Sequence, residues 1–490
     1  MIMNIKKIAA VFLSIGTLLT IIPSLLASAA DSVLDDAELN NYITEYVDET
    51  HTPGLSLVAV DGENASYKNW GYDNIAQQIP ATEHTHYELA SVSKAFTALS
   101  VLVLQEEGKL SINDSVSDYL SWFDVKWQGE SYDLKIWQLL NHTSGIPESQ
   151  TYKQVKIGTD ERLKEDTARI AEGIDLGFEP GTEFEYCNLN YDILAYLVEV
   201  ASGERFEDYV AEEIFAPIGM TETGYDIPTA QGYQRCFWQT IEYDAPRFKG
   251  CQGDGYVITT TADMSLWIKA QLGQLELPEK LEKAIEKSHR AEDASQYINA
   301  EEGADCYYLN GWMQEKDGSY MEHSGGNPNF STMLYIDRER NIGTFAATNI
   351  SSDSPVNAAR SAYKLMTEGK FEHMSASPSL DSIVAPIAVV FLLLLVLLVV
   401  LLLTQKKRLA KKAVNMKKEK IRLCLRLIIL SALLVLCFAA PYLIGYNYLF
   451  VAVWLSYSAL IALTIIDLDL ILMIVTSITR YSRQKHQTKE

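Results

Sequence analysis

Ser91 and Lys94 form an S-x-x-K tetrapeptide whose residue types and spacing are suited to acyl transfer. In a helix, three positions make just under one turn, so both side chains lie on the same face. A serine hydroxyl is a poor nucleophile until a neighbouring base takes its proton, and a desolvated lysine amine can be that base. The start of a helix also adds positive potential near a developing oxyanion.

The tetrapeptide by itself is a weak signal, because the chain contains two more, at residues 361–364 and 482–485. What distinguishes Ser91 is its context. Residues 91–107 are apolar on nearly every side, which predicts a buried central helix, and Gly108 supplies a C-terminal stop. Only this copy of the motif opens such a helix.

Tyr186 and Asn188 form a second short motif, Y-x-N, which also begins at Tyr67, Tyr72, Tyr297 and Tyr308. Again the context differs, because a turn at residues 179–182 precedes Tyr186 and a helix is expected directly after it. A tyrosine projecting from this loop beside Lys94 can pass the proton of Ser91 to a leaving amine. Asn188 would project into the same cleft.

His323, Ser324, Gly325 and Gly326 form a third motif, H-S-G-G, just before an expected strand. If this segment lies on a strand beside the cleft, His323 provides a polar or positive group there. Gly326 then provides an unobstructed backbone N–H, which together with the N–H of Ser91 makes an oxyanion hole. The alternative is a glycine turn with a surface histidine.

Both strands and helices are expected around these motifs, and they must hold the motifs in place. An apolar run between turn residues predicts a strand at 55–60, and two paired strands are expected at 333–336 and 344–347. A second helix is expected at 191–201, capped by Asn188 or Asn190 and ending before Gly203. This mixture predicts an α/β or α+β domain in which helices cover a sheet.

Charge is divided unequally along the chain. The 490 residues carry a net charge of -23, but residues 31–380 contain 59 acidic and 25 basic side chains, and residues 381–490 contain 5 acidic and 14 basic ones. So acidic a segment repels phosphate backbones, which argues against nucleic acid as a partner. It also favours cationic substrates.

Both ends of the chain carry apolar segments. Residues 1–30 have the basic start, short apolar run and A-x-A site of a signal peptide, the alternative being an uncleaved signal anchor. Residues 383–403, 423–445 and 449–478 are long enough to be transmembrane helices. Basic residues in the loop 404–422 and the tail 479–490 place both in the cytoplasm, so the domain at 31–375 is expected outside the membrane.

The third apolar stretch contains Asp467 and Asp469, which are costly in lipid. They are expected to lie near the interface or to pack against other helices, with a functional role as the alternative. A disulfide between Cys236 and Cys251 is possible, but nothing in the spacing requires it. No metal-binding pattern occurs among the cysteines, and no cofactor is expected.

Four motifs in order resemble one known family. S-x-x-K, L-L-N-H-T-S-G at 139–145, P-G-T-x-F-x-Y-x-N at 180–188 and H-S-G-G are similar to the serine β-lactamases and penicillin-binding proteins, in the class C and D-aminopeptidase branch. Residues 88–97, 190–192 and 326–331 further resemble membrane-bound peptidases that activate nonribosomal-peptide prodrugs, such as colibactin maturation peptidases. That group also carries three C-terminal membrane helices.

The resemblance implies a transpeptidase-like domain, with an antiparallel sheet flanked by helices, over about residues 35–370. It implies Ser91 as the acyl-enzyme nucleophile, Lys94 as its base and Tyr186 as the proton shuttle. His323 stands where many relatives carry the lysine of K-T-G, which argues against strong binding of a β-lactam carboxylate. Asn327 or Asn329 is a candidate contact to a polar cap, although asparagine in a turn is more often structural.

Three functions remain open from the sequence. The first is an extracytoplasmic, membrane-bound serine peptidase that removes an N-acyl-D-amino-acid cap, asparagine-like, from an acylated peptide. The second is a broader peptidase, esterase or β-lactamase acting on cell-wall peptides. The third is a non-catalytic sensor of β-lactams or peptides, against which counts the lack of a recognisable output domain after the spans. Membrane lipid is an expected partner in each case, and the oligomeric state is undetermined.

Overall fold

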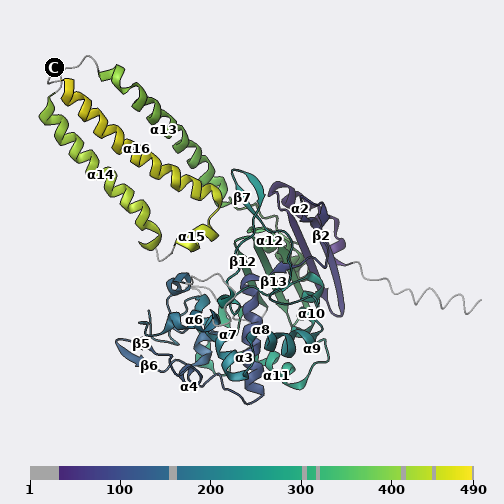
Figure 1. The fold of residues 1–490 in the computed structure, drawn as a ribbon. Helices are drawn as coiled ribbons and strands as arrows, with labels where there is room; N and C mark the ends of the chain where they lie inside the picture. Colours follow the sequence, from purple (N-terminus) through teal and green to yellow (C-terminus); the bar gives the residue numbers. More distant parts are fainter. Residues whose placement is uncertain are drawn as a thin grey trace, which may run out of the picture.

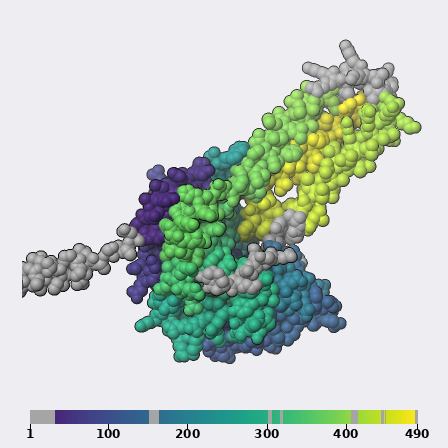
Figure 2. Space-filling model, turned by 180° about the vertical axis from the view of Figure 1, so that it is seen from behind, coloured from purple at the N-terminus to yellow at the C-terminus, as the bar shows by residue number. Residues whose placement is uncertain are grey.

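The structure is a computed structural model that describes residues 32–153, 163–300, 306–315, 320–409, 415–443 and 448–487. The predicted signal peptide at residues 1–30 lies outside these residues. A mixed domain of strands and helices occupies residues up to about 375, and three long helices extend from one end of it (Figures 1 and 2).

An eight-stranded antiparallel sheet forms the centre of the domain, which confirms the predicted fold class. The strand expected at 55–60 and the strand pair expected at 333–336 and 344–347 are part of it: β13 pairs with β14, and β14 also pairs with β1. In sheet order the strands are β10 (Cys306–Leu309), β11 (Trp312–Glu315), β12 (Met321–Asn327), β13 (Phe330–Asp337), β14 (Ile342–Thr348), β1 (Gly54–Asp61), β2 (Asn64–Asn74) and β3 (Ile79–Pro80).

Helices cover both faces of this sheet. On one face, α2 (Ala37–Glu49) and α12 (Ser354–Glu368) pack against β1, β13 and β14 in a small apolar core. On the other face lies a much larger core built around α3 (Lys94–Glu106), α7 (Asn188–Ser202) and α10 (Thr261–Gln271). The strands β1, β13 and β14 are buried along nearly their whole length because both faces are covered.

The predicted central helix is present and buried, but it begins differently from the prediction. Residues Ala90–Ser93 form a 3₁₀ turn, η3, and the α-helix α3 begins at Lys94. Eleven residues of α3, Lys94 included, are buried. The helix ends before Gly108, whose φ of +69° is the left-handed conformation that glycine adopts readily.

The second predicted helix is α7, and its predicted cap is wrong. Cys187 holds the N-cap position and Asn188 is already the first helical residue, with no side-chain cap bond. Asn190 instead lies wholly buried and bonds to Ser144 and His142. The end of the helix is as expected, since Gly203 takes up a left-handed conformation with φ of +81°.

Shorter elements complete the domain around these layers. The small sheets pair β4 (Tyr87–Glu88) with β9 (Ile258–Thr259), β5 (Val125–Trp127) with β6 (Glu130–Tyr132), and β7 (Tyr233–Cys236) with β8 (Gln239–Glu242). The remaining helices of this domain include α4 (Val116–Tyr119), α5 (Ile136–Leu140), α6 (Leu163–Ala168), α8 (Phe206–Val210), α9 (Ala216–Ile218) and α11 (Glu279–Ser288).

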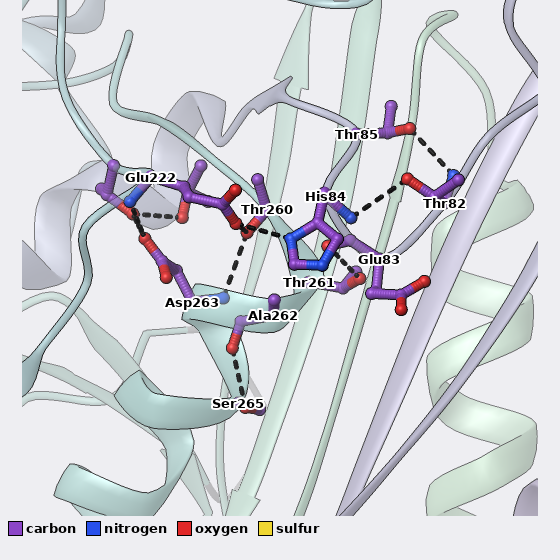
Figure 3. A network of polar contacts seen from close by, with 12 residues as sticks. Thr82, Glu83, His84, Thr85, Glu222, Thr260, Thr261, Ala262, Asp263 and Ser265 are labelled. Carbon is purple, nitrogen blue, oxygen red and sulfur yellow. Dashed lines mark hydrogen bonds and ion pairs between the residues drawn. The ribbon is translucent and has the colours of Figure 1, made fainter. Parts of the chain in front are cut away.

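A polar network ties the loop before β4 to the start of α10 (Figure 3). Thr260 caps α10 by accepting from the N–H of Asp263, and the Asp263 carboxylate accepts from the N–H of Glu222. The Glu222 carboxylate in turn pairs with His84 at 2.8 Å. Since β4 leads into Ser91 and β9 leads into α10, the network fixes both strands that flank the start of α3.

The three apolar C-terminal stretches form helices that are long and apolar enough to cross a membrane. They are α13 (Leu380–Leu409), α14 (Met416–Leu443) and α16 (Tyr457–Gln487), and α16 packs against the other two (Figure 1). The predicted third span at 449–478 is not one helix. A separate short helix, α15 (Tyr448–Trp454), precedes α16, and Ser456 begins the new helix by accepting from the N–H groups of Ala459 and Leu460.

The two aspartates of the third stretch differ in exposure. Asp469 is 1% exposed within the helix bundle, whereas Asp467 is only half-buried. The sequence predicted that these aspartates lie near the interface or pack against other helices, and buried Asp469 does the second. Cys236 and Cys251 are both free thiols, so the possible disulfide between them does not form.

Candidate active site

Ser91 and Lys94 lie together at the start of the buried helix, as their spacing predicts. Lys94 Nζ lies 3.1 Å from Ser91 Oγ and donates to the backbone carbonyl of Asp254 at 2.8 Å. The lysine side chain is 0% exposed. Among the described residues no carboxylate oxygen lies within ion-pairing distance of its amine. A buried amine held by a hydroxyl and a carbonyl is placed to exchange a proton with Ser91.

The backbone on either side of this pair is held by specific bonds. The N–H of Leu89 donates to the carbonyl of Val257 at 2.8 Å, and the N–H of Val257 donates to Ser93 Oγ at 3.1 Å. Ala90, directly before Ser91, has φ of +49°. A non-glycine residue in this region costs about 1–3 kcal/mol, and such strain clusters at functional sites. The strain thus marks the turn that presents Ser91.

Tyr186 reaches the same lysine from the loop before α7. Lys94 Nζ lies 5.0 Å from the centre of the Tyr186 ring. The Tyr186 hydroxyl is buried and has no hydrogen-bond partner among the described residues. Because a buried hydroxyl normally finds a partner, this unsatisfied group is free to bond to a substrate or an attacking water.

The H-S-G-G motif is part of strand β12 and is not a glycine turn. β12 pairs with β13 along its whole length, but β11 pairs with it only at Met321 and Glu322. The rest of that edge faces η3. Gly325 makes this approach possible, because a Cβ there would lie 2.2 Å from the carbonyl oxygen of Leu89. At Gly326 a Cβ would meet nothing within 4 Å.

His323 was expected to provide either a polar or a positively charged group. It is neutral, so it provides a polar group only. Burial, helped by nearby Lys94, lowers the pKa of His323 to about 3. Its Nδ1 donates to the carbonyl of Ser324 at 2.6 Å, which leaves Nε2 to accept from the Tyr308 hydroxyl at 3.0 Å. Ser324 itself points its side chain outward and is exposed.

A cavity of about 350 Å³ opens beside Ser91. Its polar lining includes Asn188 and Asn327, both expected at the site, and the backbone of Gly326. Asn329, the alternative to Asn327, does not line it. Asn329 is buried in the β12–β13 turn and donates to the carbonyl of Tyr243 at 3.0 Å, so its role is structural.

Asn327 is oriented by the ion pair between buried Glu88 and half-buried Arg247. Its Nδ2 donates to Glu88 Oε2 at 2.6 Å, while the other oxygen of Glu88 accepts from Arg247 Nε at 2.6 Å. Glu88 is 3% exposed. Because this bond fixes which end of the amide faces Glu88, the Asn327 carbonyl oxygen is left to accept from a ligand N–H, and the second N–H of Nδ2 remains as a donor. Asn188 Oδ1 is likewise buried without a partner among the described residues.

Three residues at the site were not singled out from the sequence. Asp254 lines the cavity, and burial raises its pKa to about 6 against the opposing effect of Lys94. Asp192 lies buried nearby, and burial together with Asp254 holds its pKa well above the usual range. His142 packs against Tyr186 with the two rings tilted by 39° and their centres 4.3 Å apart. His142 belongs to the L-L-N-H-T-S-G motif and Asp192 to the segment 190–192, so both lie in stretches that carry the family resemblance, whereas Asp254 had no such hint.

The cavity also has an aromatic side. The family resemblance placed an apolar pocket wall around residues 256–260, so of this side the sequence indicated only Tyr256. Phe248 and Tyr256 come from the loop between β8 and β9, and Phe450 and Trp454 come from α15. No spacing rule links residues 200 positions apart, so only the fold could bring them together. Among the described residues, no group of three or more His, Cys, Asp or Glu side chains could hold a metal ion.

Comparison with known proteins finds similar chains. A family profile described as Beta-lactamase matches residues 39–366. Protein flp of Staphylococcus aureus (strain N315) is 30% identical over 323 residues, covering 64% of this chain and 63% of the relative. Penicillin-binding protein 4* of Bacillus subtilis (strain 168) is 30% identical over 318 residues, covering 59% of this chain and 66% of the relative. The chain thus spans less than two thirds of the length of these relatives.

Solved structures share the fold. The octameric penicillin-binding protein homologue from Pyrococcus abyssi superposes with a TM-score of 0.59 at 25% identity, over 72% of this chain and 81% of that one. A class C beta-lactamase superposes with a TM-score of 0.57 at 20% identity, over 69% of this chain and 98% of that one. At that identity the second match speaks for the fold alone.

Proposed function

This chain belongs to the beta-lactamase family, a family of serine hydrolases, and we propose that it is a membrane-anchored hydrolase that cleaves amides through an acyl-enzyme on Ser91. The observation that carries the proposal is the 3.1 Å contact between Lys94 Nζ and Ser91 Oγ at the wall of an open cavity. A nucleophile and a base within hydrogen-bond reach are the minimum for this chemistry.

In the first step the Lys94 amine takes the proton of Ser91 as its Oγ attacks the substrate carbonyl. The N–H groups of Ser91 and Gly326 stabilise the oxyanion. The Tyr186 hydroxyl protonates the leaving amine, the C–N bond breaks, and the acyl group stays on Ser91. Lys94 returns the proton to Tyr186. In the second step a water replaces the amine, and the ester is hydrolysed by the same groups in reverse.

We propose that the acyl side carries an N-acyl-D-asparagine-like cap, so that hydrolysis frees the amine of a nonribosomal peptide. Asn188 Oδ1 and the Asn327 carbonyl oxygen are the acceptors that support this choice, since a carboxamide side chain offers two N–H donors. Anchoring through α13, α14 and α16 would hold the domain at the extracytoplasmic surface of the membrane that these helices span.

The alternative is a broader cell-envelope peptidase, esterase or β-lactamase, and one relative is named for its binding of penicillin. Neutral His323 argues against the β-lactam branch of this alternative. A carboxylate-binding site gains from a cation, because charge-assisted hydrogen bonds are the stronger ones, and His323 carries no charge at neutral pH.

The test compares three chromogenic substrates with the full-length protein: an N-acyl-D-Asn amide, a β-lactam and a short ester. We expect the amide to have the highest kcat/KM, and Ser91→Ala to lower its kcat by about 10⁴-fold or more. Faster turnover of the β-lactam or ester would favour the alternative. Undiminished amide hydrolysis by Ser91→Ala would exclude the proposed mechanism.

A further inference from the structure

A shallow pocket lies between the start of α14 and the end of α16. Three arginines line it, Arg422 and Arg426 from α14 and Arg480 from α16, and Ser477 and Tyr481 add hydroxyl groups to the same lining. The two helices pack against each other, and this end of the bundle is the one remote from the catalytic domain (Figure 1). The pocket therefore gathers hydrogen-bond donors from two different helices.

The positive charge of this pocket is only partly balanced. Glu419 also lines it and pairs with Arg422 at 2.6 Å. Among the described residues, no carboxylate oxygen lies within ion-pairing distance of Arg426 or Arg480. Two guanidinium groups that line one pocket repel each other, and an anion between them would remove this repulsion. The guanidinium fork matches the geometry of a phosphate group, which it binds through charge-assisted hydrogen bonds.

The depth of Arg426 in the membrane is a second indication of a ligand. This arginine lies within the apolar stretch at 423–445, one helical turn beyond Arg422, in a helix that is a candidate membrane span. Its side chain is exposed on the surface of the bundle. A cation at such a position is costly and normally has a partner. A lipid phosphate is the group that can supply the missing negative charge there.

The neighbouring surface of α14 suits the remainder of a phospholipid. Ile429 and Leu433 lie three and seven positions after Arg426, so they continue the same face of the helix toward the bilayer centre. Their side chains are 57% and 44% exposed. A free phosphate ion would leave these two side chains uncovered, whereas the acyl chains of a lipid would cover them.

We propose that Arg422, Arg426 and Arg480 bind the headgroup phosphate of an acidic phospholipid in the leaflet remote from the catalytic domain. The acyl chains then run along the exposed apolar face of α14. An acidic lipid is favoured over a zwitterionic one because the unbalanced charge of the pocket is positive, and basic pockets between membrane helices select acidic headgroups. The bound lipid joins α14 to α16, and the site is independent of the reaction at Ser91.

The first test measures lipid binding to the full-length protein in detergent by native mass spectrometry. Phosphatidylglycerol and phosphatidylcholine with the same acyl chains are compared. We expect wild type to bind the first phosphatidylglycerol at least about tenfold more tightly than phosphatidylcholine, and Arg426→Gln/Arg480→Gln to reduce this preference to about twofold or less. Glutamine is as good a helix former as arginine, so the variant should melt like wild type in lipid-free detergent.

Lys418→Gln/Lys420→Gln is the matched control. It removes two positive charges from the same end of α14, but both lysines are exposed and neither lines the pocket. This variant should keep the wild-type preference for phosphatidylglycerol. An equal loss in the two double variants would indicate diffuse attraction to a basic surface and would overturn the site, as would an unchanged preference in the arginine variant.

A second test distinguishes a lipid from a free anion. A ligand that binds only the folded state stabilises it, so phosphatidylglycerol should raise the melting temperature of wild type and not that of the arginine variant. Inorganic phosphate should not displace phosphatidylglycerol in the binding measurement, because it lacks the acyl chains. Displacement of the lipid by phosphate at millimolar concentration would identify a site for a free anion and would overturn the lipid assignment.

Discussion

At the scale of single residues, the site is a set of buried polar groups that are only partly satisfied. Lys94 is held by one hydroxyl and one carbonyl, and the hydroxyl of Tyr186 has no partner among the described residues. An unmade hydrogen bond in a protein interior costs about 1–3 kcal/mol. The fold maintains this cost at the place where a reacting substrate would supply the missing partner.

Replacing Tyr186 by phenylalanine tests the proton-shuttle role. The change removes only the unpartnered hydroxyl, so the melting temperature should not fall, while kcat for the amide should decrease about 10²–10⁴-fold. Steady-state kinetics and thermal unfolding of the same preparation measure both quantities.

Tyr225→Phe is the control for this change. Tyr225 is also a buried tyrosine whose hydroxyl lacks a partner among the described residues, but it packs on Phe206 and Phe215, away from the cavity. This variant should keep full activity. Equal activity of the two variants would remove Tyr186 from the mechanism.

At the scale of elements, strand β12 and the turn η3 form the two sides of the proposed oxyanion site. The alternation of a strand places Gly325 against η3 and leaves Gly326 open to the cavity. The H-S-G-G motif thus uses its two glycines for different purposes, one for close packing and one for access.

Separate alanine substitutions should distinguish the two glycines. Gly325→Ala puts a Cβ 2.2 Å from the Leu89 carbonyl oxygen, so it should destabilise the protein by about 2 kcal/mol or more. Gly326→Ala meets no atom within 4 Å, so it should melt like wild type and lose kcat/KM because the methyl group enters the cavity. Denaturant titrations and kinetics separate the two effects. Comparable stability of both variants would contradict this assignment.

At the scale of the whole molecule, three histidines are buried in the neutral form. Burial lowers the pKa of His323 and His289 to about 3 and that of His142 well below its usual range. Between about pH 6.5 and 3 the unfolded chain binds these protons and the native state does not. Stability is therefore present above pH 6.5 and is lost as the pH falls. Buried Asp254, with its pKa raised to about 6, opposes part of this loss.

His289→Gln should flatten this pH dependence without touching the site. His289 contacts Gln271 at 2.7 Å, and a glutamine amide can make the same bond. As the pH falls from 6 to 4, the unfolding free energy of the variant should decrease less steeply than that of wild type. The two slopes should differ by about 1.4 kcal/mol per pH unit. Denaturant unfolding of the full-length protein in detergent, repeated across this range, measures the slope.

His84→Gln is the control, because the contribution of His84 to stability changes with pH in the opposite direction to that of His289. The bond to Glu222 raises the pKa of His84, so its contribution is present at low pH and is lost as the pH rises through the folded-state value. The side chain is 60% exposed, so solvent screening keeps the effect small. A steeper slope for His289→Gln than for wild type would contradict the neutral burial of this histidine.

The sequence by itself determined the features that depend on near neighbours in the chain. The spacing of Ser91 and Lys94, the apolar helix that follows them and the three apolar C-terminal segments are all local patterns. Local patterns also predicted β1 and the β13–β14 pair correctly. The errors concerned the exact residue at which an element begins. At α7 the sequence predicted an asparagine as the N-cap, whereas Cys187 is the last extended residue and holds that position.

Only the tertiary structure decided which distant residues share the cavity. Asp254, Asn327 and Trp454 line it together with Ser91 although up to 363 positions separate them. It also decided that His323 is neutral and that Asn327, not Asn329, faces the cavity. These properties depend on burial and on contacts between elements, and burial is set by the packing of the whole chain. No single segment encodes it.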